Sequence, residues 1–318
     1  METPVLKTQS SLNFLLVEHD LGAPTNGAAQ GPQAVLAHLF AKIPQAQTQA
    51  VSTITQTTTP PKEQTPHAKS LEQTLETCKS LRDAVSKSLK KKNFTIVLSG
   101  DHSTAIGTIA GIKTAFPSLE IGIVWFDAHT DIHSPYTTHS GNLHGMPLSA
   151  ATQLDNTADR RQVPTDHEKK LWKEMKGLAP TKPMVELENI VFVGIRDMEQ
   201  EEKNLVKGRD CLILDAAYVK HESSNALVTK IKHHLRHCDI IYMSFDIDCL
   251  DKSIVPGTGT PVENGPDAEK VLDIVSQLST WERVVCFELS EVNPTLDPSG
   301  KTTEVATNIA RNALSFLS

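Results

Sequence analysis

Three apolar, β-branched segments of this chain each end in a short run of residues that commonly bind metal ions. The segments are residues 94–98, 121–126 and 240–245, and the runs that follow them are Ser-Gly-Asp-His-Ser over 99–103, Asp-Ala-His-Thr-Asp over 127–131 and Asp-Ile-Asp over 246–248. Such segments are typical of parallel strands that are buried on both faces. Because the carboxyl ends of parallel strands meet at one edge of an open α/β sheet, where ligands bind, we expect the three runs to share one site.

The spacing within these runs suits a metal centre. Residues two apart in an extended segment point to the same side, so Asp127, His129 and Asp131 can face one point, as can Asp246 and Asp248. Crowded carboxylates repel each other unless cations neutralise them, and an oxygen-rich set with imidazoles suits Mn²⁺. Two ions roughly 3.5–4 Å apart can hold a hydroxide between them at neutral pH. The predicted chemistry is therefore attack of this hydroxide on an electrophilic carbon.

Further motifs are spread over nearly the whole chain. They are Gly-Ala-Pro at 22–24, Gly-Pro at 31–32, Gly-Ile-Arg-Asp at 194–197, Pro-Gly-Thr-Gly-Thr-Pro at 256–261 and Glu-Val-Asn-Pro at 291–294. Together with the three ligand runs they make the chain similar to the arginase and agmatinase (ureohydrolase) family. The run Ser-Gly-Asn-Leu-His-Gly at 140–145 resembles the arginase branch rather than the agmatinase branch.

The resemblance implies two Mn²⁺ ions and a ligand set for each. One ion would be held by His102, Asp127, Asp131 and Asp246, and the other by His129, Asp127, Asp246 and Asp248, with Asp127 and Asp246 bridging the two. Co²⁺ and Ni²⁺ fit the same ligands, so the residues do not decide the metal.

Three more residues match catalytic or substrate positions of the family. His144 matches a histidine that relays protons, and an imidazole that titrates near neutrality suits this role. Glu291 matches the acid that binds the guanidinium group, for which a carboxylate is the geometrically matched acceptor. Thr260 would line the pocket near the metals, and His144 or Asp131 would deliver the proton to the departing amine.

The residues expected at the amino-acid end of the substrate depart from the family. Ser140 and Asn142 match positions that reach the α-carboxylate, but a third position, usually Asn, is His133. An imidazole can still donate one hydrogen bond. The acid that meets the α-amino group, usually Asp, is Glu199, which is one methylene longer. These changes can retune specificity without changing the metal chemistry.

The predicted function is hydrolysis of L-arginine to L-ornithine and urea by attack of metal-held hydroxide on the guanidinium carbon. One alternative is another ureohydrolase, acting on agmatine, guanidinobutyrate or formiminoglutamate. A substrate without an α-carboxylate would make no use of Ser140 and Asn142. The alternative from a different class is a catalytically silent, metal-stabilised binding protein, although every ligand position of the family is filled in this chain.

The order of apolar and amphipathic segments predicts an α/β fold, a three-layer αβα sandwich with a mostly parallel central sheet. Strands are expected near 12–17, 94–98, 121–126, 189–193, 211–214, 240–245 and 283–288. Helices are expected near 32–41, 67–92, 103–115, 199–207, 223–237, 266–279 and 302–316.

No Gly/Ser- or Pro-rich linker divides the chain between two sets of apolar strands, so we expect one catalytic domain over 1–318. A Thr- and Gln-rich segment at 45–65 is predicted to be a polar surface segment. The resemblance implies a loop insertion at 153–170 relative to typical arginases. A solvated surface loop is favoured there over a lid, and Trp172 is expected to anchor it.

Composition predicts a soluble, compact enzyme with a cytoplasmic location, and the resemblance implies a small guanidino substrate. The formal net charge of −7 argues against a nucleic-acid surface. No apolar stretch is long enough to span a membrane, and the start of the chain lacks a basic leader. An odd count of five cysteines favours reduced thiols, and Cys249 is expected to pack behind the site. The resemblance also implies a homo-oligomer, a trimer or a hexamer.

Two other groups of histidines need an interpretation. His233, His234, His237 and Cys238 have a spacing that could place several of them on one helix face. They also close a basic helical stretch, where imidazoles favour the negative end of the helix dipole, and this interpretation is preferred to a metal site. His139 faces either the mouth of the active site or solvent.

Overall fold

The computed structural model describes residues 11–43, 50–60 and 62–317, and its centre is an eight-stranded sheet. The strand order is β2-β1-β3-β8-β7-β4-β5-β6, and all neighbours pair in parallel. The strands are β1 Leu12–Glu18, β2 Ala50–Thr55, β3 Phe94–Ser99, β4 Ile121–Phe126, β5 Ile190–Ile195, β6 Leu212–Asp215, β7 Ile240–Asp246 and β8 Val284–Ser290.

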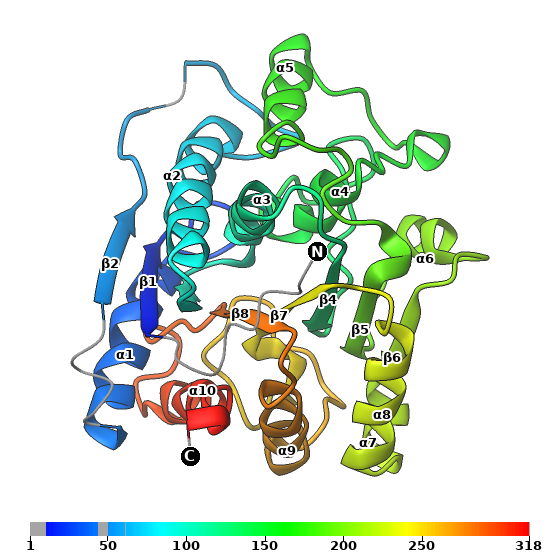
Figure 1. The fold of residues 1–318 in the computed structure, drawn as a ribbon. Helices are drawn as coiled ribbons and strands as arrows, with labels where there is room; N and C mark the ends of the chain where they lie inside the picture. The colour runs from blue at the N-terminus through cyan, green and yellow to red at the C-terminus, as the bar shows by residue number, and fades with distance from the viewer. Residues whose placement is uncertain (1–10, 44–49, 61, 318) are drawn as a thin grey trace.

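Helices cover both faces of this sheet, which confirms the predicted three-layer αβα sandwich (Figure 1). One face carries α2 Leu71–Lys90, α3 Ala105–Ala115, α4 Pro147–Thr152 and α5 Asp166–Met175, with α6 Gln200–Val206 at its end. The other face carries α1 Gly31–Lys42, α7 Ala216–His221, α8 Ser224–His234, α9 Ala268–Ser279 and α10 Lys301–Asn312.

The central strands form because their side chains pack into two hydrophobic cores, one on each face of the sheet. Every residue of β3, β4, β5, β7 and β8 is buried. Alternate residues point to opposite faces. In β4, for example, Val124 and Phe126 join one core, while Ile123 and Trp125 join the other. Strands that are buried on both faces have continuous apolar sequences, which is why these strands could be predicted.

Strand β2 was not predicted from the sequence. It lies inside the Thr-rich segment 45–65 and pairs with β1 at the edge of the sheet, with all of its side chains at least partly exposed. An exposed edge strand has no buried face, so its sequence lacks the apolar pattern of the central strands. Residues 45–49 and Pro61 of that segment, and residues 1–10 at the start of the chain, lie outside the described residues.

The second half of the predicted insertion is helical rather than irregular. Helix α5 begins at Asp166 and has a capping box, in which Thr165 and Glu168 each bind the other's backbone N–H. Glu168 also accepts hydrogen bonds from the backbone N–H of His67, at 2.7 Å, and contacts the His67 ring nitrogen Nδ1 at 3.0 Å. Trp172 is buried and its Nε1 donates to Asp155 at 2.8 Å, so it does anchor the segment.

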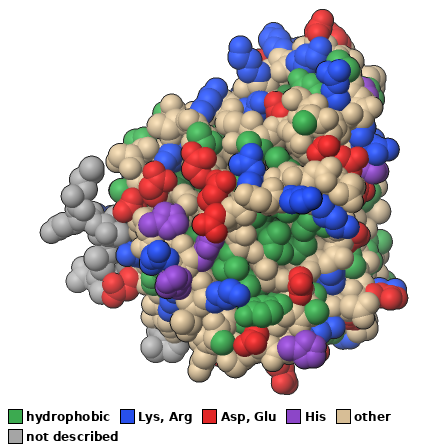
Figure 2. Space-filling model, turned by 90° about the vertical axis from the view of Figure 1, so that its right-hand side faces the viewer, with side chains coloured by type: hydrophobic (Ala, Val, Ile, Leu, Met, Phe, Trp, Pro, Cys, Tyr) green, Lys and Arg blue, Asp and Glu red, His purple; other side chains and the backbone are tan. Residues whose placement is uncertain are grey.

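Charged side chains of both signs are interspersed over the face of the molecule that Figure 2 shows. Among the residues that the structure describes, none of the helices is both long and apolar enough to cross a lipid bilayer.

Candidate metal centre and active site

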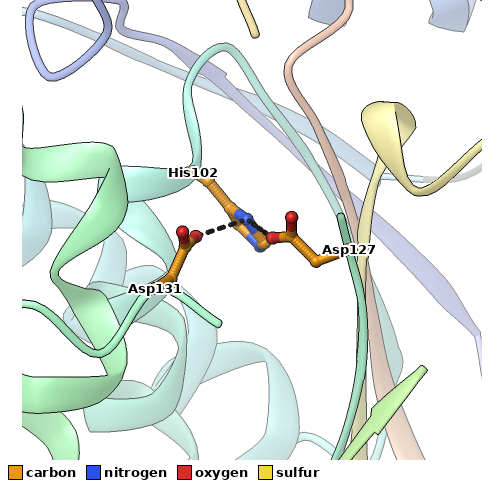
Figure 3. A group of neighbouring side chains, drawn as sticks. All are labelled: His102, Asp127 and Asp131. Atoms are coloured by element: carbon orange, nitrogen blue, oxygen red, sulfur yellow. Dashed lines mark hydrogen bonds and ion pairs between the residues drawn. The ribbon is translucent and has the colours of Figure 1, made fainter. Parts of the chain in front are cut away.

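The first group of predicted ligands gathers around the ring of His102. Its Nδ1 lies 3.2 Å from Asp127 Oδ2, 3.2 Å from Asp131 Oδ2 and 3.3 Å from Asp246 Oδ2. Figure 3 shows the ring between the two carboxylates of Asp127 and Asp131. All four side chains are buried, and they come from the carboxyl ends of β3, β4 and β7.

The second group gathers around His129. Its Nδ1 lies 3.3 Å from Asp127 Oδ1 and 3.3 Å from Asp248 Oδ2. Asp127 therefore turns one carboxylate oxygen to each group. The structure brings all six predicted ligands together at one edge of the sheet, as the positions of their strands require.

Local backbone structure holds these ligands in place. Asp131 has a left-handed backbone with φ of 50°, and the Asp127 carboxylate accepts the N–H of His129 at 2.7 Å. The Asp246 carboxylate caps the short 3-10 helix Ile247–Cys249 by accepting the N–H of Asp248 at 2.8 Å. Such caps are typical of Asp at the start of a helical turn.

The electrostatics of the cluster favour divalent cations. Burial and the charge of Asp127 raise the pKa of Asp131 to about 7. Burial, with the charges of Asp248 and Asp127, raises the pKa of Asp246 well above its usual value. Buried carboxylates can stay ionised when cations offset their charge. The residues thus fit a metal pair, and His102, Asp127 and Asp131 form one group that could hold an ion and Asp127, His129 and Asp248 another.

Two side chains behind the ligands were not predicted from the sequence. The Trp125 ring stacks on His102 at 4.1 Å, and its Nε1 donates to Asp127 Oδ2 at 3.1 Å. Ser244 Oγ lies 2.8 Å from His102 Nε2. Each of them stands two residues before a ligand at the end of its strand, on the same side of the sheet. This spacing is a signal from which both could have been found.

Arg196, from the Gly-Ile-Arg-Asp motif, fixes the loop that carries Asp248. Its guanidinium group donates to the carbonyl oxygens of Gly194, Asp248, Cys249, Leu250, Val262 and Glu263 at 2.8–3.0 Å. Cys249 is buried and its Sγ contacts the carbonyl oxygen of Val193 at 3.5 Å, which confirms that it packs behind the site. All five cysteines are free.

A cavity of about 300 Å³ opens beside the ligands. Its lining includes the predicted residues His129, Asp131, His133, Ser140, Asn142, His144, Glu199 and Thr260. Thr260 Oγ1 donates to Asp248 Oδ2 at 3.0 Å, so it contacts a predicted ligand directly.

His144 and Glu291 form a pair next to this cavity. His144 Nδ1 lies 3.1 Å from Glu291 Oε1, which also accepts the backbone N–H of His102 at 2.9 Å. Burial lowers the pKa of His144, but the hydrogen bond and charge of Glu291 outweigh it and raise the pKa to about 9. The other oxygen of Glu291, Oε2, is buried without a hydrogen-bond partner among the described residues.

The residues predicted for the amino-acid end of the substrate line the outer part of the same cavity. His133 Nε2 lies 2.7 Å from Glu199 Oε2. Ser140 Oγ accepts the N–H of Asn142 at 3.1 Å, and Asn142 Oδ1 accepts from Lys69 Nζ at 3.2 Å.

The histidines near the end of α8 have separate hydrogen-bond contacts. His234 Nε2 lies 2.9 Å from the carbonyl oxygen of Glu188, and His237 Nε2 lies 2.7 Å from Asn189 Oδ1. Within the described part of the chain they do not form a group that could hold a metal ion.

Comparison with known proteins identifies the class. The family model described as the Arginase family matches residues 11–315. An arginase of Entamoeba histolytica is 28% identical over 289 residues, which cover 90% of this chain and 92% of that protein. Human Arginase-1 is 34% identical over 237 residues, which cover 71% of this chain and 66% of the human protein. A crystal structure of the Entamoeba histolytica arginase in complex with L-ornithine matches with a TM-score of 0.85 and 27% identity, and covers 96% of this chain and 99% of that chain.

The fold and the site thus define an α/β enzyme with a buried cluster of His and Asp residues that could hold metal ions. More particularly, the chain belongs to the arginase family, a family of hydrolases.

Proposed function

We propose that this protein is a binuclear manganese enzyme that hydrolyses L-arginine to L-ornithine and urea. The observation that carries this proposal is the convergence of six ligand-type side chains, four of them carboxylates, beside one cavity that His129 and Asp131 line. Membership of the arginase family and the likeness to an arginase crystallised with L-ornithine support it.

His102, Asp127, Asp131 and Asp246 would hold one ion, and His129, Asp127, Asp246 and Asp248 the other. When bound, a pair of divalent cations lowers the pKa of water and so supplies a nucleophile at neutral pH. The donor set of carboxylate oxygens and two imidazole nitrogens suits Mn²⁺, and also accepts Co²⁺ or Ni²⁺.

Glu291 would bind the guanidinium group of the substrate. Its Oε2 is buried without a partner, and a buried carboxylate oxygen in this state is a strong acceptor for a cationic N–H. His144 Nδ1 lies 3.1 Å from the other oxygen of this carboxylate, so the two side chains can share a proton. His144 or Asp131 would pass a proton to the departing amine.

The residues that line the outer part of the cavity would recognise the amino-acid end of the substrate. Ser140 and Asn142 offer polar groups to the α-carboxylate, and the Lys69 ammonium group next to Asn142 adds a positive charge that favours an anion. Glu199 would meet the α-amino group, and His133 lies beside it. Arginine has both groups, whereas agmatine lacks the carboxylate.

Urea release by the Mn²⁺-loaded protein tests the proposal. L-arginine, agmatine, guanidinobutyrate and formiminoglutamate are supplied in parallel, ammonia and formamide are also measured, and His129→Ala is the blank. Turnover of arginine supports the proposal. Turnover of another substrate alone would keep the metal chemistry and make the protein a different ureohydrolase. If the metal-loaded protein releases no product from any of the four compounds, the interpretation as a non-catalytic binding protein would be favoured.

One catalytic domain over 1–318, a cytoplasmic location and assembly into a trimer or a hexamer stay predictions. Light scattering measures the mass of the assembly directly. A monomer at micromolar concentration would contradict the expected homo-oligomer.

A further inference from the structure

A second cluster of metal-binding side chain types lies at the mouth of the cavity, outside the six ligands. His139 Nε2 lies 3.3 Å from Glu199 Oε2 and 3.1 Å from Glu201 Oε2. His133 Nε2 lies 2.7 Å from the same Glu199 oxygen. We call His133, His139, Glu199 and Glu201 the mouth cluster.

Three of the four side chains in the mouth cluster have ligand atoms spaced like those of the metal centre. His139, Glu199 and Glu201 each offer one ligand atom, and these atoms lie within 4.8 Å of one another. The nitrogen-to-oxygen distances of 3.1 and 3.3 Å resemble those around His102, which are 3.2–3.3 Å. Ligands about 2.0–2.2 Å from a tetrahedral ion lie about 3.3–3.6 Å apart, so small movements of these side chains would admit an ion.

The neighbouring charges leave the mouth cluster negative. Burial would raise the pKa of Glu201, but hydrogen bonds from its backbone N–H, from Arg161 and from His139 lower it to about 2. Arg161 Nη1 binds Glu201 Oε1 at 3.0 Å, which leaves Oε2 facing His139. Glu202 is not counted in the cluster, because its two oxygens accept from Thr130 Oγ1 and from the N–H of Glu199, although its Oε2 also lies 3.5 Å from His133 Nε2.

A separate observation at His133 points to a bound cation. The Nε2 atom is buried and has no hydrogen-bond partner, although Glu199 Oε2 is 2.7 Å away, so this contact lacks the alignment of a hydrogen bond. The other ring nitrogen, Nδ1, is engaged with Thr137 Oγ1 at 3.1 Å. A cation shared between His133 Nε2 and Glu199 Oε2 would satisfy this buried nitrogen.

We propose that the mouth cluster binds one further divalent cation of the zinc type, through His133, His139, Glu199 and Glu201. Two imidazole nitrogens and two carboxylate oxygens form a donor set that suits tetrahedral Zn²⁺. Its consequence rests on the proposed function. An ion there occupies His133 and Glu199, the residues expected at the amino-acid end of the substrate, and so inhibits the enzyme by raising KM.

The test compares the Mn²⁺-loaded wild type with the double variant His139→Ala, Glu201→Gln. Each protein is titrated with Zn²⁺, freed of weakly bound ions, and assayed for total manganese and zinc by mass spectrometry. We expect the wild type to retain one more metal equivalent than the double variant. The single variant His139→Ala should weaken zinc binding by about tenfold or more. His233→Ala, which removes an exposed histidine on α8, is the matched control and should behave as the wild type.

Equal metal content in the wild type and the double variant would overturn the proposal, because the zinc would then lie elsewhere, for example in exchange for manganese at the main centre. If the difference of one equivalent appears, zinc should also raise KM for arginine in the wild type and not in the double variant. Inhibition that is equal in both proteins would overturn the regulatory part. Failure of urea release would contradict the proposed function and leave the metal count intact.

Discussion

Replacing Arg196 tests whether one side chain holds the loop of Asp248. Arg196→Met keeps most of the length of the side chain and removes its donors. Six carbonyl oxygens lose a cationic partner, those of Gly194, Asp248, Cys249, Leu250, Val262 and Glu263. The guanidinium group has five N–H donors for these six acceptors, so at about 1.5 kcal/mol for each donor the bonds would sum to about 7–8 kcal/mol.

The net effect will be smaller, because Arg196 is partly exposed and water can reach some of the freed carbonyls. We therefore expect Arg196→Met to lower the free energy of unfolding by about 3–4 kcal/mol. Arg196→Lys, which keeps the charge but cannot span six acceptors, should recover less than half of that loss. Both variants should also bind metal more weakly, since Asp248 lies on the loop.

Urea denaturation of the metal-free proteins, followed by circular dichroism, measures this change. Arg160→Met is the matched control, since Arg160 is exposed, and should shift the free energy of unfolding by less than about 0.5 kcal/mol. A loss below about 1 kcal/mol in Arg196→Met would refute the reasoning, because the carbonyls would then be satisfied equally well by water.

Three further predictions concern the site and its support. Ser244→Ala removes the group that lies 2.8 Å from His102 Nε2, so metal affinity measured by calorimetry should fall about 10–100-fold, while Ser80→Ala on the exposed face of α2 should leave it unchanged. Ser140→Ala should raise KM for arginine by about fivefold to tenfold and leave KM for agmatine unchanged, whereas equal effects on both would contradict carboxylate recognition. Burial raises the pKa of Glu168, but hydrogen bonds from His67 and Thr165 outweigh it and lower the pKa. The stability that Glu168 contributes is thus present above its unfolded pKa of about 4.3 and is lost as pH falls through the lower folded value. Wild type and Glu168→Gln should therefore differ in melting temperature at pH 7 and converge in acid, and a difference that persists at low pH would contradict this assignment.

The positions of the metal-type ligands could be predicted because two general rules act on them. Buried parallel strands have continuous apolar sequences, and their carboxyl ends meet at one edge, so Asp127 and Asp246 had to lie near each other. The helices α4 and α7 were not predicted, because each is six residues long and gives little periodicity. Helix α5 did carry a readable signal in the Thr-x-x-Glu sequence at 165–168.

Contacts between distant loops could not be predicted from the sequence. The short distance between His133 and Glu199 depends on how the loop after β4 meets the start of α6, and no local pattern encodes it. The same holds for the Lys69 ammonium group beside Asn142. These contacts follow from tertiary packing, which sets the chemistry of the cavity mouth.

Asp127 gives one carboxylate oxygen to each of the two histidine groups. The two halves of the centre therefore share a single rotamer. An ion that fixed this carboxylate for one half would therefore change binding at the other half, and the linkage would be reciprocal. The two halves would not fill and empty as independent sites.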